Sequence, residues 1–453
     1  MSSTPETSTL SEQLSQLRGS MQWLVRRSGS ELQRARGSYR NPFARDRARV
    51  LHCSSFRRLQ GKLSWPSLDE GEVMRSRLTH ALETAQLARG LLRALEGLHS
   101  RSEPWVALLP DPNLLESIAF ARELGAAPFG RGGEIMLNCL MHEHGGFETR
   151  AQSIRLLARQ EPYAEGFGLD PSRRLLLGML DRPCPWSRLL SPRPRQQPGP
   201  GMVPLREHWS PPQGFYDEDQ DLVDWVLMPL EGPEADRLLM PRRLATAQQH
   251  GHAGPGSLDA SLVQLAAGIA QGVHEFEDGL TLGEIAREDW EAIELDRGWA
   301  EAVDLGDIDG IGQALFGSST PARKRAIGTL VNALVVSAEV EPLPGHEEAL
   351  LAWQVQLLPQ AQVFLGGLQA LVQRRLYDRA QVQMQEHRGQ IVLRELFEAC
   401  VTTPKRLLRD EALAAYAGAE SETAKMRVIA DQLAGLSDAH ATRLHDKLVN
   451  GVG

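Results

Sequence analysis

The sequence predicts an all-α fold, and three observations support this prediction. Apolar residues recur at steps of three and four over long stretches, which places them on one face of a helix. Alternation of apolar and polar residues is scarce, and residues 391–393 are too short a run to predict a sheet. With 42% hydrophobic residues in a chain of 453, there are enough apolar side chains for a sizeable core.

The helices are expected in the following order along the chain. Residues 78–95 carry apolar side chains on one face, as expected of a helix that packs on a core. Residues 114–124 are more apolar all round, which is typical of a central helix. Further helical periodicity predicts helices at 257–276, 324–338, 348–377, 390–400 and 423–436.

Two segments are expected to be irregular. Residues 1–38 are predicted to form a polar, disordered N-terminal tail, whose first residues lack the basic-then-apolar order of a signal peptide. Residues 190–213 are rich in proline, which fixes φ and removes backbone donors, so we expect an irregular excursion there. No fixed-period repeat is found along the chain.

Charge and cysteine content narrow the class of protein. A net charge of −9 argues against a surface that coats nucleic acid broadly, although it permits a local basic patch. No apolar run approaches the roughly 20 residues that a membrane span needs. The cysteines lack the spacing of zinc ligands and are expected to be reduced, buried thiols of a cytoplasmic protein: Cys53, Cys139, Cys184 and Cys400.

Several motifs together carry a family resemblance. Residues 119–134 read Ala-Phe-Ala-Arg-Glu-Leu-Gly-Ala-Ala-Pro-Phe-Gly-Arg-Gly-Gly-Glu, and residues 77–83 read Arg-Leu-Thr-His-Ala-Leu-Glu. These motifs, and the order in which they occur along the chain, resemble those of the bacterial dGTP triphosphohydrolases of the HD-domain superfamily. The other segments that match the motifs of that family are 41–52, 55–62, 145–148, 216–219, 326–332 and 427–431.

The resemblance implies a fold, a reaction and an assembly. It implies an HD-domain helical core at residues 39–290, which contains the proline-rich excursion, and a helical C-terminal region at 291–453 packed on that core. The family hydrolyses a deoxynucleoside triphosphate to deoxynucleoside and triphosphate with a divalent metal such as Mg or Mn. Family members form oligomers, so a homo-oligomer or a mixed oligomer with an active paralogue is expected.

The metal site of the family is the part that this chain does not keep. The resemblance places His80 at the first histidine ligand, Arg122 at the second, Glu123 at an aspartate ligand and Ala267 at the last aspartate. A guanidinium has no lone pair to donate and is permanently charged, so it repels a divalent ion rather than binding it. We therefore expect no metal cofactor, with His80 and Glu123 as remnants of the site and His80 as an ordinary helix histidine.

Catalytic and nucleotide-contacting positions also depart from the family pattern. Arg131 replaces a catalytic histidine, and Glu134, at the family's catalytic glutamate, is expected to be vestigial. Asp181 reverses the charge of a lysine that contacts the triphosphate, and Gln271 replaces a tyrosine. The nucleotide or phosphate pocket that the resemblance implies comprises Arg57, Arg58, Lys62, Ser64, Arg122, Arg150, Asp181, Arg182 and Gln271.

Two interpretations of these arginines follow. In one, Arg122 and Arg131 pair with Glu123 and Glu134 and fill the former metal cavity. In the other, they form a clamp that binds a phosphate without hydrolysing it. A basic run from Arg34 to Lys62 is either a solvated helix face or a surface for single-stranded DNA.

Three functional hypotheses follow from these interpretations. The first is an inactive homologue that binds a deoxynucleotide or single-stranded DNA, or that regulates through oligomerisation. The alternative is an active dGTP triphosphohydrolase in which His80, Glu123 and Glu134 recruit an ion at a remodelled site. The third is a structural interaction module whose cleft the arginine network closes. No association with a membrane is expected.

Overall fold

The structure is a computed structural model that describes residues 21–30, 41–63, 75–193, 195, 197–199 and 201–449. Helices dominate these residues, and the described strands form two antiparallel two-stranded sheets. This confirms the predicted all-α fold. Across the described ranges, none of the helices combines the length and the apolar character needed to cross a membrane.

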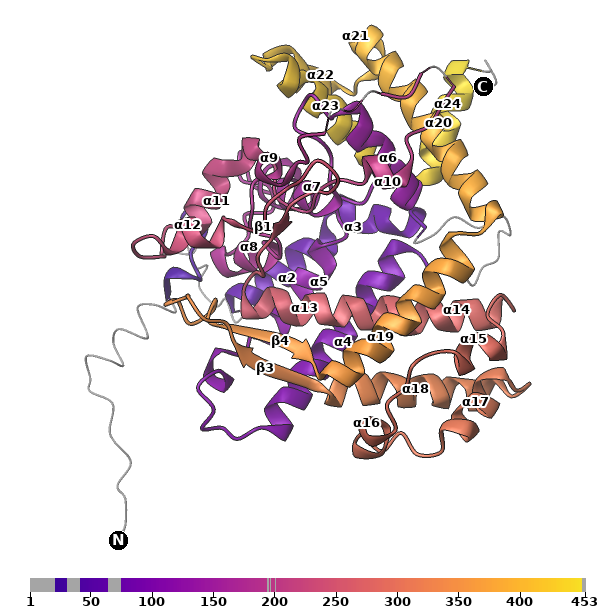
Figure 1. The fold of residues 1–453 in the computed structure, drawn as a ribbon. Helices are drawn as coiled ribbons and strands as arrows, with labels where there is room; N and C mark the ends of the chain where they lie inside the picture. The colour runs from indigo at the N-terminus through magenta and orange to yellow at the C-terminus, as the bar shows by residue number, and fades with distance from the viewer. Residues whose placement is uncertain are drawn as a thin grey trace, which may run out of the picture.

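Three helices form the centre of the molecule. α13 (Leu258–Ile269) lies across the middle of the view in Figure 1 and packs against α4 (Arg77–Leu98) and α5 (Pro112–Ala121). Every residue of α5 from Leu114 to Ala121 is buried, which explains why its sequence is apolar nearly all round. α2 (Pro42–His52) covers another side of α5.

The remaining elements follow in chain order around this centre. Up to α13 they are α3 (Ser54–Arg58), η2 (Leu59–Gly61), η3 (Val106–Leu108), α6 (Gly130–Leu140), α7 (Thr149–Arg155), η4 (Leu156–Gln160), α8 (Arg173–Met179), α9 (Trp186–Leu189), α10 (Arg206–Trp209), η5 (Asp217–Asp219), α11 (Gln220–Leu227), α12 (Glu234–Leu238), β1 (Pro241–Arg243) and β2 (His252–Ala253). After α13 they are η6 (Ala270–His274), α14 (Glu275–Thr281), α15 (Arg287–Glu291), α16 (Arg297–Ala302), α17 (Ile308–Phe316), α18 (Thr320–Val336), β3 (Ala338–Pro342), β4 (Trp353–Leu357), α19 (Pro359–Val372), η7 (Gln373–Tyr377), α20 (Ala380–Thr402), α21 (Pro404–Leu407), α22 (Asp410–Gly418), α23 (Glu422–Ala434) and α24 (Asp438–Val449).

Most of the described apolar core lies in one large cluster and a second cluster at one end, and a small third cluster holds Ile135, Cys139 and Trp209. The large cluster runs from Trp23 to Val382 and includes the contact between Trp290 and Phe364, whose ring centroids are 6.1 Å apart. The second cluster joins α6 to α20 and α23, which Figure 1 shows gathered at one end of the molecule. The large cluster therefore crosses the boundary expected near residue 290, and the division into 39–290 and 291–453 stays a prediction.

Most predicted helices are confirmed, and one is wrong at its start. The ranges 78–95, 114–124, 390–400 and 423–436 fall mainly within α4, α5, α20 and α23. The predicted helix 348–377 instead begins with strand β4, which pairs with β3, and α19 starts only at Pro359. In β4, Val355 and Leu357 are buried at alternate positions, a short strand period that helical periodicity over the longer window obscured.

The prediction that residues 1–38 form a disordered tail is wrong for residues 21–30, the part that the structure describes. Trp23 and Arg26 are buried, and Arg26 Nη1 lies 2.7 Å from Asp46 Oδ1 on α2. The backbone N–H groups of Arg173 and Arg174 donate to the carbonyl oxygens of residues 25 and 23. Residues 21–30 are thus packed on the protein by a buried ion pair and backbone hydrogen bonds, and the rest of 1–38 lies outside the described residues.

The proline-rich excursion is irregular, as expected. Its described residues from 190 to 205 form neither helix nor strand, and the chain becomes helical again only in α10. This segment crosses the surface beside the β1–β2 sheet, because the Gly251 N–H donates to the Leu189 carbonyl and Ser191 Oγ donates to the Thr246 carbonyl. The excursion therefore borders the surface pocket considered below.

Candidate functional site

The candidate site is built on a tight turn at the start of α6. Phe129 and Gly130 both have left-handed backbone angles, with φ of 61° and 59°. A Cβ at Gly133 would lie 1.8 Å from the Pro128 carbonyl oxygen, and a Cβ at Gly132 would lie 2.9 Å from Glu386 Cβ of α20. The glycines of the family-like motif are therefore required by close packing, independently of any catalytic chemistry.

Arg122, which follows α5, forms an ion pair with Asp181, which follows α8. Arg122 Nη1 and Arg150 Nε each lie 3.3 Å from Asp181 Oδ2, and the Arg122 and Asp181 side chains are buried. Burial alone would raise the pKa of Asp181, but the guanidiniums of Arg150, Arg122 and Arg182 outweigh it and hold that pKa below its usual value. The two guanidiniums thus balance a buried, ionised carboxylate.

Glu123 is engaged by the helix that carries His80. Arg77 Nη1, in the first turn of α4, donates to Glu123 Oε2 at 3.2 Å. Burial opposes ionisation of Glu123, but Arg77, His80 and Arg122 lower its pKa below the usual range. Burial lowers the pKa of His80, which favours a neutral imidazole.

These residues do not fit a divalent metal ion. Glu123 is already bound by Arg77, and Arg122 directs its charge into the same network. α13 carries Ala267, whose methyl group cannot bind a metal, and Gly268, which has no side chain, at the positions where the resemblance implies carboxylates. Within the described part of the chain, no three His, Cys, Asp or Glu side chains are arranged to hold a metal.

Arg131 and Glu134 on α6 have structural partners other than those expected. Arg131 Nη1 donates to Gln373 Oε1 at 2.9 Å, and its guanidinium lies 5.0 Å from the centre of the Tyr377 ring. Glu134 Oε1 accepts a hydrogen bond from the Thr149 N–H at 2.8 Å, at the start of α7. Among the described residues, Arg122 thus pairs with Asp181 rather than Glu123, and Arg131 with Gln373 rather than Glu134, which differs from the first of the two interpretations.

The phosphate side of the expected pocket is narrow. A cavity of about 10 Å³ borders Arg150, Asp181 and Arg182, and it has room for about one water molecule rather than a phosphate group. Arg182 Nη1 donates to Gln264 Oε1 at 3.2 Å. Gln271 is half-buried on η6, whereas Ser64 lies outside the described residues.

Lys62, which was expected in the pocket, is buried and bonded to backbone carbonyl oxygens. Its side chain is 1% exposed, and Nζ donates to the carbonyl oxygens of Ala126 and, at 2.6 Å, of Ala434. Burial lowers the pKa of Lys62 to about 7. The lysine fastens α23 to the segment before α6, because an amine buried without a carboxylate partner stabilises itself on backbone carbonyls.

Arg57 and Arg58, also expected in the pocket, are occupied locally on α3. Arg57 is exposed and donates to the His52 carbonyl at 3.0 Å. Arg58 donates to the hydroxyls of Ser54 and Ser55 at 3.0 and 2.7 Å. Both guanidiniums thus donate hydrogen bonds to groups close to them in the sequence. Neither residue contacts the Arg122 network through these bonds.

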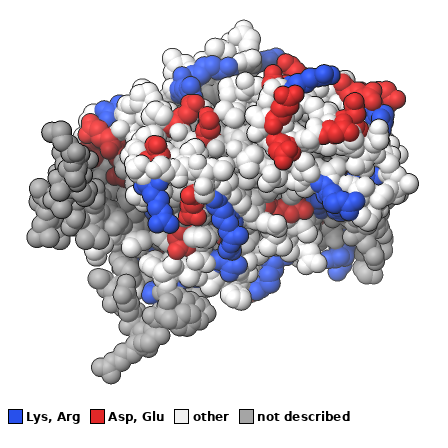
Figure 2. Space-filling model, turned by 90° about the horizontal axis from the view of Figure 1, so that it is seen from below, with Lys and Arg blue, Asp and Glu red and all other residues white. Residues whose placement is uncertain are grey.

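The basic run is partly neutralised where the structure describes it. Arg47 forms an ion pair with Glu116, and Arg49 Nη1 lies 3.3 Å from Asp170 Oδ2. On the face drawn in Figure 2, basic and acidic side chains are interspersed. Residues 31–40, which hold the first arginines of the run, lie outside the described residues.

Four residues of the site were not singled out from the sequence. Glu148 caps α7 by accepting hydrogen bonds from the N–H groups of residues 150 and 151, and burial raises its pKa well above the usual range. Tyr377 donates to Glu275 Oε1 at 2.9 Å, and burial raises the pKa of Glu275 to about 7. Arg77 lies in the same motif as His80, so the sequence could have indicated it as a site residue. Nothing in the sequence links Tyr377 to Glu275.

Comparisons with known proteins agree with the fold and the motifs. Residues 356–447 match the family model described as a phosphohydrolase-associated domain. A deoxyguanosinetriphosphate triphosphohydrolase-like protein of Vibrio parahaemolyticus is 38% identical over 428 residues, which are 92% of this chain and 95% of the relative. A protein of the same name from Shewanella pealeana is 36% identical over 433 residues, 94% of this chain and 96% of that relative.

Proposed function

Because this chain belongs to the family of deoxyguanosinetriphosphate triphosphohydrolase-like proteins of the HD-domain superfamily, we propose that it is a member that does not hydrolyse dGTP. In this proposal it binds the phosphate groups of a deoxynucleotide without cleaving them, and the cavity of about 10 Å³ beside Arg150, Asp181 and Arg182 widens to admit them. The observation that carries the proposal is the buried ion pair between Arg122 and Asp181. The family resemblance puts Arg122 at the position of a metal ligand, and the Asp181 carboxylate balances its charge.

Electrostatics argues against catalysis by a metal at this position. Two unit charges 4 Å apart interact by about 4 kcal/mol at an effective dielectric constant of 20, so a divalent ion and a guanidinium repel by roughly twice that. The remaining candidate ligands, His80 and Glu123, offer few donor atoms against this repulsion, and Glu123 would first have to leave Arg77. Recruiting Glu134 would break its hydrogen bond to the Thr149 N–H.

The excess of positive charge in the site supports anion binding. Arg77 Nε and Arg150 Nη1 are buried and donate no hydrogen bond to any described residue, so an anion would satisfy them. Glu148 and Glu275 have raised pKa values and oppose a bound anion less than ionised carboxylates would. Besides Glu148 and Glu275, the site has three carboxylates: Glu123, Glu134 and Asp181. Its guanidiniums outnumber these three, since they belong to Arg77, Arg122, Arg131, Arg150 and Arg182.

We favour a deoxynucleotide over single-stranded DNA as the ligand. Arg47 and Arg49 of the basic run are paired with carboxylates, which leaves less free charge to follow a nucleic-acid backbone. Assembly into a homo-oligomer, or into a mixed oligomer with an active paralogue, remains a prediction, as does a cytoplasmic location. Size-exclusion chromatography with light scattering tests the assembly directly.

The purified full-length chain can be tested for metal, turnover and binding together. After incubation with Mn²⁺ and dialysis, we expect well under one ion per chain and no release of triphosphate from dGTP. With EDTA present, dGTP should still raise the melting temperature. The variant Arg150→Gln should lose most of this rise, while Arg287→Gln, an exposed arginine on α15, should keep it.

Each other outcome points to a different hypothesis. A stoichiometric ion that survives dialysis, together with triphosphate release, would establish the alternative of an active hydrolase with a remodelled site. A melting temperature unmoved by any deoxynucleotide would contradict binding and leave the structural interaction module. A larger response to single-stranded DNA than to dGTP would replace the favoured ligand.

A further inference from the structure

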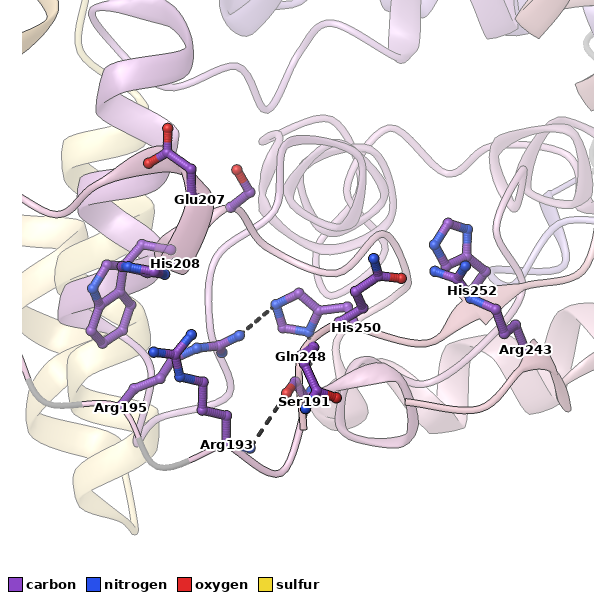
Figure 3. A pocket seen from close by; sticks show the side chains of 12 residues that line it. Ser191, Arg193, Arg195, Glu207, His208, Arg243, Gln248, His250 and His252 are labelled. Atoms are coloured by element: carbon purple, nitrogen blue, oxygen red, sulfur yellow. Dashed lines mark hydrogen bonds between the residues drawn. The ribbon is translucent and has the colours of Figure 1, made fainter. Parts of the chain in front are cut away.

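A second pocket lies outside the Arg122 network, between the proline-rich excursion, α10 and the β1–β2 sheet. Its volume is about 610 Å³, within the range of pockets that hold small ligands. Figure 3 shows Arg193 and Arg195 on one side of His250, and Arg243 and His252 on the other. The pocket is therefore bordered by cationic side chains from segments about 50 residues apart in the sequence.

The arginines of this pocket lack acidic partners. In the described ranges, Arg193, Arg195 and Arg243 form no ion pair with a carboxylate, unlike most arginines around the Arg122 site. Glu207 is the acidic residue among those that line the pocket, and Figure 3 shows its carboxylate directed away from Arg193 and Arg195. Guanidiniums collected around a concave surface without counter-charges favour an anionic ligand.

Arg195 is held in place by neutral groups. Its Nη2 lies 2.7 Å from His250 Nε2, and its guanidinium lies 5.8 Å from the centre of the Trp209 ring. Burial and the neighbouring Arg195 lower the pKa of His250 to about 4, so the imidazole is neutral at physiological pH.

His250 is fixed in place by the segment that follows α9. The Ser191 N–H donates to His250 Nδ1 at 3.0 Å, and the same nitrogen lies 3.3 Å from the Leu189 carbonyl oxygen. His250 thus orients Arg195 without neutralising its charge, which leaves the remaining guanidinium N–H groups for a ligand.

We propose that this pocket binds the phosphate groups of a small anion, either a free polyphosphate or a nucleotide. The guanidinium is planar and donates two parallel hydrogen bonds, a geometry that suits phosphate oxygens. Gln248 and Gln249, which also line the pocket, add neutral hydrogen-bonding groups. The proposal does not depend on binding at the Arg122 site, because it uses a separate set of residues.

Calorimetric titration of the full-length chain with inorganic tripolyphosphate tests the proposal. The double variant Arg193→Gln/Arg243→Gln removes two lining charges that are exposed and make no ion pair in the described structure, so the fold should be kept. The matched control Arg188→Gln/Arg242→Gln removes two exposed arginines from the same segments that do not line the pocket. We expect the pocket variant to bind roughly tenfold or more weakly than the parent chain, and the control to bind within about twofold of it.

Further arms separate the ligand sources and the two sites. Equal affinity for tripolyphosphate and dGTP would show that the pocket recognises the phosphate groups alone. Tighter binding of dGTP, together with no binding of deoxyguanosine, would show that the pocket also contacts the nucleoside. The proposal is overturned if tripolyphosphate does not bind, if both double variants lose affinity equally, or if only Arg150→Gln loses it. The last result would support the Arg122 site while removing this pocket, so the two proposals fail separately.

Discussion

Arg122 and Asp181 contact each other across the candidate site, with 3.3 Å between Arg122 Nη1 and Asp181 Oδ2. In the sequence they are two separate departures from the family pattern, one at a metal ligand and one at a phosphate contact. In the structure they are partners, and Asp181 is shared with Arg150. The positive charge of Arg122 is therefore balanced by the negative charge of Asp181.

The variant Asp181→Asn should be strongly destabilised. It keeps the shape of the side chain but leaves Arg122 and Arg150 in a buried region without their carboxylate, which costs about 3–5 kcal/mol in comparable buried pairs. Urea denaturation followed by circular dichroism measures the change. The control Glu291→Gln removes an exposed i,i+4 pair with Arg287 and should cost less than about 0.5 kcal/mol. Equal stability of Asp181→Asn and the parent chain would show that the buried pair is not needed.

The central helices were predictable because each carries its own periodicity. α4 and α5 contain the apolar spacing within a single segment, so local sequence was sufficient to find them. The β3–β4 pair was missed because β4 is short and only Leu358 separates it from α19, whose helical pattern begins at Pro359. Residues 21–30 were missed because their order depends on a distant partner, Asp46, on another helix.

The sequence predicted several residues of the site, but it did not predict which of them form ion pairs with each other. The motif positions identified Arg122, Glu123 and Arg131 as the changed residues, since each stands at a fixed place in a recognisable segment. Their partners come from segments distant in sequence, and several carboxylates were available to each guanidinium. Distance and burial decide among them, and these depend on the packing of α6 and α8 rather than on local sequence.

Stability should depend on pH through Glu275. Its pKa in the folded chain is raised to about 7, so between about pH 4.5 and 7 the folded state binds the proton more tightly than the unfolded state does. Stability is therefore lost as the pH rises through this interval. The variant Glu275→Gln stays neutral and retains an oxygen to accept from Tyr377, so its stability should change less.

The measurement for Glu275 is a pair of denaturation series at pH 5 and pH 7.5. The stability of Glu275→Gln relative to the parent should increase by on the order of 2–3 kcal/mol between the two pH values. Glu291→Gln, which changes an exposed carboxylate, provides the comparison and should show little change. A constant difference between Glu275→Gln and the parent would mean that Glu275 titrates normally in the folded chain.

The first turn of α6 should tolerate no side chain at Gly133. In Gly133→Ala, the new Cβ would lie 1.8 Å from the Pro128 carbonyl oxygen, so the turn must move and the chain should lose roughly 1–3 kcal/mol or more. Gly97→Ala in α4 is the matched change, because its Cβ meets no atom within 4 Å and alanine favours a helix. Thermal melts should therefore shift in opposite directions, and a neutral Gly133→Ala would show that the turn is not closely packed.

Restoring the family's metal ligands should return metal without returning activity. The variant Arg122→His/Glu123→Asp/Ala267→Asp adds an imidazole and a carboxylate, removes the repelling guanidinium, and shortens the side chain that Arg77 now holds. We expect about one Mn²⁺ per chain after dialysis, by mass spectrometry of the metal. Triphosphate release should remain near background, because Arg131 still stands at the catalytic histidine and Asp181 still repels a phosphate. Adding Asp181→Lys to this variant should improve dGTP binding; rapid turnover in the triple variant alone would show that the metal ligands were the whole loss.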